Sequence, residues 1–382
     1  MRNIKFIIIS VIPLLLACNK QKEKRIPVIV FSDLYFPAQD VGDNFDIIIP
    51  YALPELELKG VIFDITEKYR REGNVPTVTR EPGFIPIIQL NYIFNKNVPA
   101  ACSPFVAMRT VDDKMENVPA FQQEGINLFF ELLENSKQKV EVVCTGSGRG
   151  LAVAFNRNPK LMKEKIKTIH FCAGASSETF REWNIELDTL AAYRLLTSDL
   201  PINIYPCATD KGPFDKGQNN TFWAMDNLNF ISNMDVKLQK YLQFSFLQKN
   251  RTDFLNYIET YVKKEDRESM DVYEIGKLYG SGGKHYVWET AVWQQITGRK
   301  IVKLQNGKIR LIPVDKVTLN DIVFNEMIRP CKLNVQKSGL FSFEYTEEKT
   351  NFGIYFREDP IQNEQWLREA LAELFISFTI NN

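Results

Sequence analysis

Four aspartates in one short stretch are the residues of this sequence best placed to do chemistry. The stretch FSDLYFPAQDVGDNFD puts Asp33, Asp40, Asp43 and Asp46 just after an apolar run at residues 27–31. Such a run is typical of a buried strand, and open α/β sheets bind ligands at the carboxyl ends of their strands. The aspartates therefore suit a metal or catalytic site, although aspartate is also common in turns and at helix N-caps for purely local reasons.

The start of the chain is typical of an exported protein. Arg2 and Lys5 precede an apolar segment at residues 6–16, which is too short to span a bilayer as a mature helix. The segment runs into Leu-Leu-Ala-Cys at residues 15–18, which resembles the lipobox of bacterial lipoproteins, where the chain is cut before a cysteine that becomes lipidated. The alternative is an ordinary secretory signal with a chance cysteine.

This pattern predicts how the chain is organised. We expect a signal peptide at residues 1–17, a tether at 18–26 lipidated on Cys18, and a single domain at 27–382. No other stretch is long and apolar enough to cross a membrane, so we expect membrane contact through the lipid anchor only. Asn19 follows the cysteine, which in lipoproteins usually implies the bacterial outer membrane.

Composition argues against several classes of function. The chain is 45% apolar and 25% charged with a formal net charge of zero, and it has no basic block, so we expect no nucleic-acid partner. Without CxxC spacing or paired histidines, the later cysteines form no zinc pattern. No GxSxG motif supports a serine hydrolase, and His170 and His285 are the only histidines. The cysteines in question are Cys102, Cys144, Cys172, Cys207 and Cys331.

Short apolar runs alternate with helical patterns along most of the chain. The expected strands lie at residues 27–31, 56–63, 86–90, 140–144, 166–171 and 200–206. The expected helices lie at residues 43–53, 120–134, 150–156 and 187–197. Alternation at this spacing predicts an α/β fold with a doubly wound, mostly parallel central sheet flanked by helices.

The last third of the chain has a different pattern. Residues 257–293 look helical and aromatic, while residues 300–313 and 339–356 look like antiparallel strands, with a turn signal at Asn306-Gly307. Residues 364–378 are typical of an amphipathic closing helix. We therefore expect a small antiparallel C-terminal extension of the main fold.

Four segments, taken in order, resemble the inosine-uridine preferring nucleoside hydrolase family. They are VIVFSDLYFPAQDVGDNFDIIIPYALPELELKGV, VEVVCTGSGRGLAVAF, KIKTIHFCAGA and EWNIELDTLAAYRLLTSDLPINIYPCA. The resemblance, which makes this chain a divergent member, implies hydrolysis of the N-glycosidic bond of a ribonucleoside. It also implies Ca²⁺ held by loop carboxylates, a threonine carbonyl and a C-terminal aspartate, with one loop aspartate as general base on water.

The resemblance transfers to individual residues of the first loop. Asp33 falls on the catalytic, metal-binding aspartate, Asp43 on a second metal ligand, and Thr145 on the threonine whose carbonyl binds the ion. The loop departs from the family at Gly42, where a further aspartate is expected, and it carries extra residues. Asp40 or Asp46 can substitute, and we assign Asp40 to the metal and Asp46 to the substrate.

The resemblance also implies a sugar-binding pair. Glu182 and Asn184 match an E-x-N motif whose side chains hydrogen-bond the sugar hydroxyls. The alternative is a polar loop before a helix that Asp188 caps.

The C-terminal part of the site departs most from the family. Val287-Trp288 falls where the family has His-Asp, one residue closing the metal shell and the other protonating the leaving base. With a slipped register, His285 or Glu289 can stand in, and we assign Glu289 to the metal; otherwise both functions are lost. Trp288 is assigned to the substrate, although aromatic residues at helical spacing, here with Trp293, are more often core.

A basic residue lies in the second matched segment, where Ser147-Gly148-Arg149-Gly150 replaces Pro-Leu-Thr-Asn. We interpret Arg149 as a solvated surface residue, the alternative being a grip on an anionic group of the substrate.

Two functions follow. The first is a metal-assisted hydrolase of a nucleoside or related N-riboside with Asp33 as base; the second is a catalytically impaired lipoprotein that binds a nucleoside or a sugar. A structural lipoprotein without a ligand is a third possibility, disfavoured by Glu182 and Asn184. The resemblance further implies a homo-oligomer.

Overall fold

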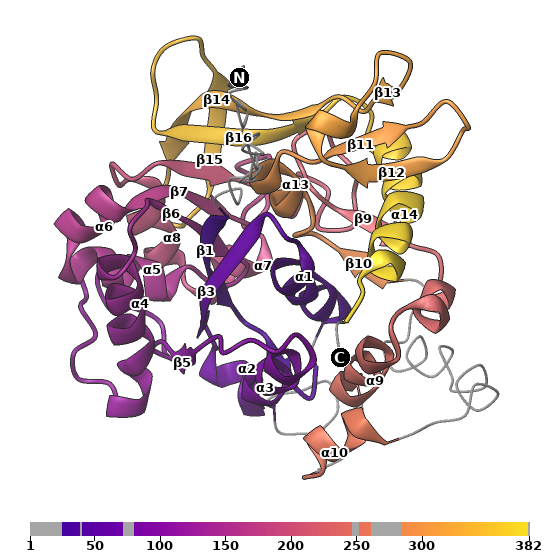
Figure 1. Cartoon of the computed structure of the whole chain (residues 1–382). Coiled ribbons are helices and arrows are strands. Elements are labelled where there is room, and N and C mark those ends of the chain that lie inside the picture. The colour runs from indigo at the N-terminus through magenta and orange to yellow at the C-terminus, as the bar shows by residue number, and fades with distance from the viewer. Residues whose placement is uncertain (1–24, 39, 72–79, 247–251, 261–284, 381–382) are drawn as a thin grey trace, which may run out of the picture.

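The computed structural model describes residues 25–38, 40–71, 80–246, 252–260 and 285–380 (Figure 1). The expected signal peptide, Cys18 and most of the expected tether lie outside the described residues. Within the described ranges, the structure contains no helix with the length and apolar character needed to cross a membrane.

A nine-stranded sheet forms the centre of the molecule, in the order β15-β14-β16-β8-β7-β6-β1-β3-β5. Every pair from β16 to β5 is parallel, while β14 runs antiparallel to both of its neighbours. This confirms the predicted mostly parallel sheet. The strands are β1 (Ile26–Ser32), β3 (Leu56–Phe63), β5 (Ala100–Cys102), β6 (Val140–Cys144), β7 (Ile166–Phe171), β8 (Ile202–Ile204), β14 (Glu326–Val335), β15 (Phe341–Tyr345) and β16 (Phe352–Arg357).

Helices cover both faces of the sheet, as Figure 1 shows. Successive residues of β1 enter different cores: Val28 and Val30 belong to one, Ile29 and Phe31 to the other. This alternation is the period of a strand buried on both faces. One face carries α1 (Val41–Ala52), α3 (Phe84–Ile93), α9 (Val236–Phe246), α13 (Ala291–Thr297) and α14 (Pro360–Ser377), and the other carries α4 (Glu124–Glu134), α5 (Arg149–Arg157), α6 (Pro159–Lys165) and α8 (Thr189–Leu196).

The strand order reverses beside β1. From β1 the chain builds outward through β3 to β5, then returns to β6 on the other side of β1 and continues through β7 and β8. In doubly wound sheets, ligands bind in the crevice outside the carboxyl ends of the strands at such a point. The crevice after β1 and β6 is therefore where the fold favours a site.

Shorter elements complete the chain. The predicted antiparallel extension is present: β11 pairs with β12 and β13, and Gly307 at the predicted turn has a φ of +83°. Strands β14 and β15 extend the central sheet itself. The bounds are β2 (Tyr35–Phe36), β4 (Glu81–Pro82), β9 (Trp223–Met225), β10 (His285–Val287), β11 (Lys300–Lys303), β12 (Ile309–Ile312), β13 (Ile322–Val323), α2 (Glu67–Arg71), α7 (Trp183–Leu187) and α10 (Phe254–Glu259).

One predicted strand is wrong. Residues 86–90 belong to helix α3, which starts at Phe84 and places Pro86 in its first turn, where the missing N–H costs no hydrogen bond. A short apolar run does not distinguish a strand from a buried helix, and this one is a helix buried along one side. Of the expected helical stretch at 257–293, residues 261–284 lie outside the described residues, and 285–287 form a strand.

The core under β14 and β16 contains a carboxyl group that titrates abnormally. Glu326 is buried, and the hydroxyl of Tyr355 donates to its Oε2 at 2.8 Å. Burial raises the pKa of the Glu326 carboxyl to about 7. The folded protein therefore holds this proton more tightly than the unfolded chain between about pH 4.5 and 7.

We expect Glu326→Gln to remove part of the pH dependence of stability. As pH rises through that window, the wild type loses free energy of unfolding on the order of 3 kcal/mol from this group, whereas the variant does not. Urea unfolding at pH 4.5 and pH 8 measures the difference. Glu348→Gln, at an exposed ion pair with Lys332, is the matched control. Parallel pH profiles for wild type and Glu326→Gln would contradict the assignment.

Candidate functional site

Two predicted site residues meet at the crevice beside β1. Asp33 follows the last residue of β1, and Thr145 follows the last residue of β6. The two strands are parallel neighbours, and the backbone N–H of Thr145 donates to the Phe31 carbonyl at 2.9 Å. Strand pairing alone therefore brings together residues more than a hundred positions apart.

A pocket of about 290 Å³ opens at this crevice and collects most of the predicted site residues. Its walls combine carboxyl groups with aromatic rings. Asp46 is buried outside the pocket lining, and Cys18 lies outside the described residues. The lining residues are Asp33, Asp40, Asp43, Thr145, Glu182, Trp183, Asn184, Cys207, Pro213, Phe214, Trp288 and Glu289.

Helix α1 brings two of the aspartates to the pocket. Asp40 is its N-cap, and its Oδ1 accepts from the backbone N–H of Gly42 at 2.6 Å, while Asp43 lies in the first turn. Acidic residues are favoured at this end of a helix by its partial positive charge. Burial raises the pKa of Asp40 to about 6, and burial followed by the charge of Asp33 raises the pKa of Asp43. Asp40 therefore caps helix α1, one of the two roles that the sequence allowed, and it lines the pocket at the same time.

Asp33 is buried, with 9% of its surface exposed. Burial, followed by the charge of Asp64, raises its pKa to about 8. Asp64 is wholly buried just after β3 and accepts from the Ser147 hydroxyl at 2.9 Å. It was missed by the sequence analysis because it stands alone after an apolar run; its place at the carboxyl end of a strand beside β1 was the available signal.

Gly42 leaves a space that carboxylate oxygens surround. A Cβ atom at this residue would lie 3.1 Å from Asp40 Oδ1 and 3.5 Å from Glu289 Oε2. Asp46 lies one turn further along the same face of α1, and helical side chains lean toward the N-terminus, hence toward this space. Neither of its buried carboxylate oxygens has a hydrogen bond of good geometry, but the side chains of Thr290 and Trp293 lie within reach of them, and burial raises the pKa of Asp46 to about 8. A carboxyl that is so readily protonated does not by itself call for a cation.

Glu182 and Asn184 are held rigidly at the pocket wall. Glu182 accepts backbone N–H groups from Gly174 at 2.8 Å and from Asn184 at 3.0 Å, and burial raises its pKa to about 7. The Asn184 amide donates to the carbonyls of Cys172 at 2.9 Å and Thr145 at 3.3 Å. Both side chains therefore have a fixed orientation, and the Asn184 amide also contacts the carbonyl proposed as a metal ligand.

An aromatic cluster lies at the other side of the pocket. The rings of Phe214 and Trp288 are 5.9 Å apart, and both contact Phe222 and Tyr286. Trp293, by contrast, is buried away from the pocket, as expected for a core residue. The sequence left two alternatives for these tryptophans, contact with a ligand or packing in the core. In the structure Trp288 lines the pocket, whereas Trp293 packs in the core.

The two residues considered as stand-ins for the expected His-Asp pair also differ in their places. Glu289 lines the pocket, and its Oε2 accepts from the Trp288 backbone N–H at 3.2 Å. His285, on β10, is buried and is absent from the pocket lining, and burial lowers its pKa to about 4. Of the two stand-ins that a slipped register allows, only Glu289 reaches the pocket.

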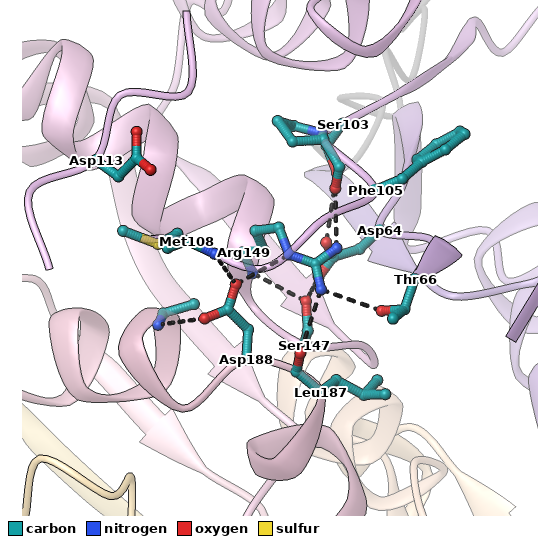
Figure 2. A network of polar contacts seen from close by, with 12 residues as sticks. Asp64, Thr66, Ser103, Phe105, Met108, Asp113, Ser147, Arg149, Leu187 and Asp188 are labelled. Atoms are coloured by element: carbon teal, nitrogen blue, oxygen red, sulfur yellow. Dashed lines mark hydrogen bonds and ion pairs between the residues drawn. The ribbon is translucent and has the colours of Figure 1, made fainter. Parts of the chain in front are cut away.

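Arg149 is wholly buried, so the interpretation as a solvated surface residue is wrong. Its Nε donates to Asp188 Oδ2 at 3.0 Å, and its other nitrogens donate to the carbonyls of Ile65 and Pro104 and to the Thr66 hydroxyl (Figure 2). A guanidinium with five fixed donors can join loops in this way, whereas the short segment around it carries no signal of the distant partners.

The donor set of the pocket suits a hard cation. Its carboxylates and the carbonyl of Thr145 offer oxygen, which Ca²⁺ prefers. Among the residues that the structure describes, no three Asp, Glu, His or Cys side chains converge closely enough to hold an ion. The carboxylates thus surround the pocket instead of meeting at one point.

Solved structures of nucleoside hydrolases resemble this one at low sequence identity. A plant nucleoside hydrolase is 14% identical with a TM-score of 0.53, over 91% of this chain and 99% of that one. A purine-preferring ribonucleoside hydrolase from Gardnerella vaginalis is also 14% identical, with a TM-score of 0.51, over 92% and 99%. This chain has a nucleoside hydrolase-like fold. An inosine-uridine preferring nucleoside hydrolase from Bacillus anthracis gives a TM-score of 0.45 at 13% identity, over 92% and 99%.

Sequence comparison alone gives no relative. No protein-family model matches the chain, and no curated protein matches it significantly. At identities this low, structural likeness establishes the nucleoside hydrolase-like fold, and the chemistry of the pocket must be judged on its own residues.

Replacing Arg149 tests whether its buried charge organises the crevice. Arg149→Met leaves Asp188 and Asp64 buried without their cation, so we expect a loss of about 3–5 kcal/mol in the free energy of unfolding, measured by urea denaturation. Arg181→Met, which breaks a solvent-exposed pair with Glu186, is the control, with an expected loss of less than about 1 kcal/mol. Equal, small losses in both variants would refute the structural role of Arg149.

Proposed function

We propose that this protein hydrolyses the N-glycosidic bond of a ribonucleoside or related N-riboside, with Asp33 as the general base. The observation that carries the proposal is the pocket itself: five carboxyl side chains, Asn184 and several aromatic rings line one crevice at the reversal point of a nucleoside hydrolase-like fold. The carboxyl groups suit a sugar and a developing positive charge, and the rings suit a planar aglycone.

Asp33 is the group best placed to activate water. Burial and the charge of Asp64 raise its pKa to about 8, close to neutrality, which suits a residue that must take up a proton and release it again. Its role is to accept a proton from the water that attacks the anomeric carbon. The neighbouring carboxylates favour the positive charge of an oxocarbenium-like transition state.

Glu182 and Asn184 are proposed to orient the sugar. Their contacts with the backbone leave them little freedom to rotate, so binding a sugar through them costs little further ordering. A carboxylate and an amide together can pair with the donor and acceptor of a sugar hydroxyl.

We propose Ca²⁺ as the divalent cation. To hold it, groups that surround the pocket would have to converge on the ion: Asp33, Asp40, Asp43, Glu289 and the carbonyl of Thr145. Such an ion, when bound, supplies Lewis-acid activation of water and a grip on the sugar diol. The residues themselves provide the oxygen donors and the dry, acidic pocket.

Asp33→Asn tests the proposed base. We expect a loss of ribosidase activity of about 10²–10⁴-fold. In cation-free buffer the melting temperature should be unchanged or higher, because the change removes a buried carboxyl that faces other acids. Steady-state hydrolysis assays and thermal melts measure both, with the exposed Asp112→Asn as control. Full activity of Asp33→Asn would exclude it as base, and wild-type binding of ribosides without hydrolysis would favour the lipoprotein that only binds.

Calorimetric titration of Ca²⁺ into the chelator-treated protein tests the cation. We expect saturable binding, with a rise in melting temperature, because the ion binds the folded state. Asp43→Asn and Glu289→Gln should weaken or abolish both effects, and Asp112→Asn should not. Wild-type protein without heat of binding or a thermal shift would mean that the acids serve the substrate or the helix N-terminus alone.

A further inference from the structure

The aglycone side of the pocket consists of exposed aromatic surface. Trp183, Phe214 and Trp288 all line the pocket, and Phe214 leaves 61% of its surface exposed, a large fraction for an aromatic ring. Phe214 and Trp288 are held at 5.9 Å by the cluster behind them. A planar aromatic group is the ligand that such a surface fits.

Among the described residues, the nitrogen and sulfur donors near this side of the pocket are already hydrogen-bonded or lie outside the lining. The Trp288 indole N–H is already donated to the Pro213 carbonyl at 2.9 Å, and the Cys207 thiol donates to the Tyr205 carbonyl. His285 is buried outside the lining, with its pKa lowered by burial. His170 lies within the sheet core between Glu141 and Tyr205.

The two carboxyl groups nearest to this side act as acceptors. Glu182 receives two backbone N–H groups, and Glu289 receives the backbone N–H of Trp288. In the part of the chain that the structure describes, no Lys, Arg, His or Tyr side chain lines the pocket. A neutral base, which needs a proton to leave easily, would have to take it from one of the carboxyl groups, whereas an aglycone that is already cationic needs none.

The charge of the pocket favours a positive ligand. Five carboxyl groups line it and no cationic side chain stands among the described lining residues, so a positive ligand relieves the repulsion among those carboxyl groups that are ionised. Tryptophan and phenylalanine rings add attraction for a cation over their faces.

From these features we infer that the substrate is an N-riboside with a positively charged aromatic aglycone, such as a pyridinium. The inference rests on the proposed function. When the C1′–N bond breaks, its electron pair stays on the ring nitrogen, which becomes neutral, so the leaving group needs no proton. Water forms the new C1′–O bond and gives its proton to Asp33. Riboside cation and water thus become ribose, neutral heterocycle and a proton.

Two ribosides that share a sugar test the inference: nicotinamide riboside, with a cationic ring, and inosine, with a neutral one. For each compound, kcat/KM is divided by the rate constant of its spontaneous hydrolysis under the same conditions. We expect this ratio for nicotinamide riboside to exceed the ratio for inosine by at least about 10-fold. Equal or faster hydrolysis of inosine would overturn the inference and leave the proposed function standing. Hydrolysis of neither compound, nor of other ribonucleosides, would overturn the proposed function itself.

A binding measurement tests the effect of the ring's positive charge separately from its effect on the reaction rate. In Asp33→Asn, nicotinamide riboside should bind at least about 10-fold more tightly than its ring-reduced form, which has nearly the same shape but no charge. Trp288→Leu should lower kcat/KM for nicotinamide riboside by about 3- to 30-fold, with a smaller loss in Trp288→Phe. Phe121→Leu, at an exposed ring outside this pocket, is the control. Equal binding of the two forms, or no effect of Trp288→Leu, would overturn the inference.

Discussion

The buried charge of Arg149 is the interaction on which the geometry of the crevice depends. Segments that follow parallel strands are no longer held by the regular hydrogen bonds of the sheet, yet here they must hold functional groups in place. Arg149 joins the segments after β3 and β5 to Asp188, the residue that starts α8. A buried ion pair contributes little net stability compared with an apolar replacement, but it specifies geometry, because each missing partner leaves an unpaired charge.

In the pocket, buried acidic side chains lack the cationic partner that Asp188 has. Asp188 is paired with a guanidinium and two backbone N–H groups, whereas Asp33 faces other acids and its pKa rises to about 8. Residues of one type thus differ because of what surrounds them. Concentrating like charges in a buried pocket costs stability, and proteins accept such a cost where a site must bind or react. The balanced acid builds the scaffold and the unbalanced ones form the site.

Local sequence patterns were sufficient for the sheet and insufficient for the side-chain network. The strand at residues 56–63 follows from a β-branched apolar run, and its structural bounds agree with the pattern. The prediction for residues 86–90 failed because apolar composition alone does not set the period, and the run is part of a longer helix, Phe84–Ile93. Arg149 failed for a different reason: its partners lie up to 84 residues away in sequence, so its burial is decided by topology and not by its neighbours.

The acid at position 289 illustrates why resemblance at single positions understates what a site retains. The resemblance leads us to expect an aspartate at position 42 and a His-Asp pair at positions 287 and 288, and the sequence has neither. In space, Oε2 of Glu289 lies 3.5 Å from where a Cβ of residue 42 would stand, close to Asp40. That distance is an ordinary van der Waals contact, so the position of Glu289 does not depend on a glycine at residue 42. The carboxylate oxygens near this residue come from Asp40 and Glu289, which lie on two segments far apart in sequence, and only the folding of the chain brings them to one wall of the pocket.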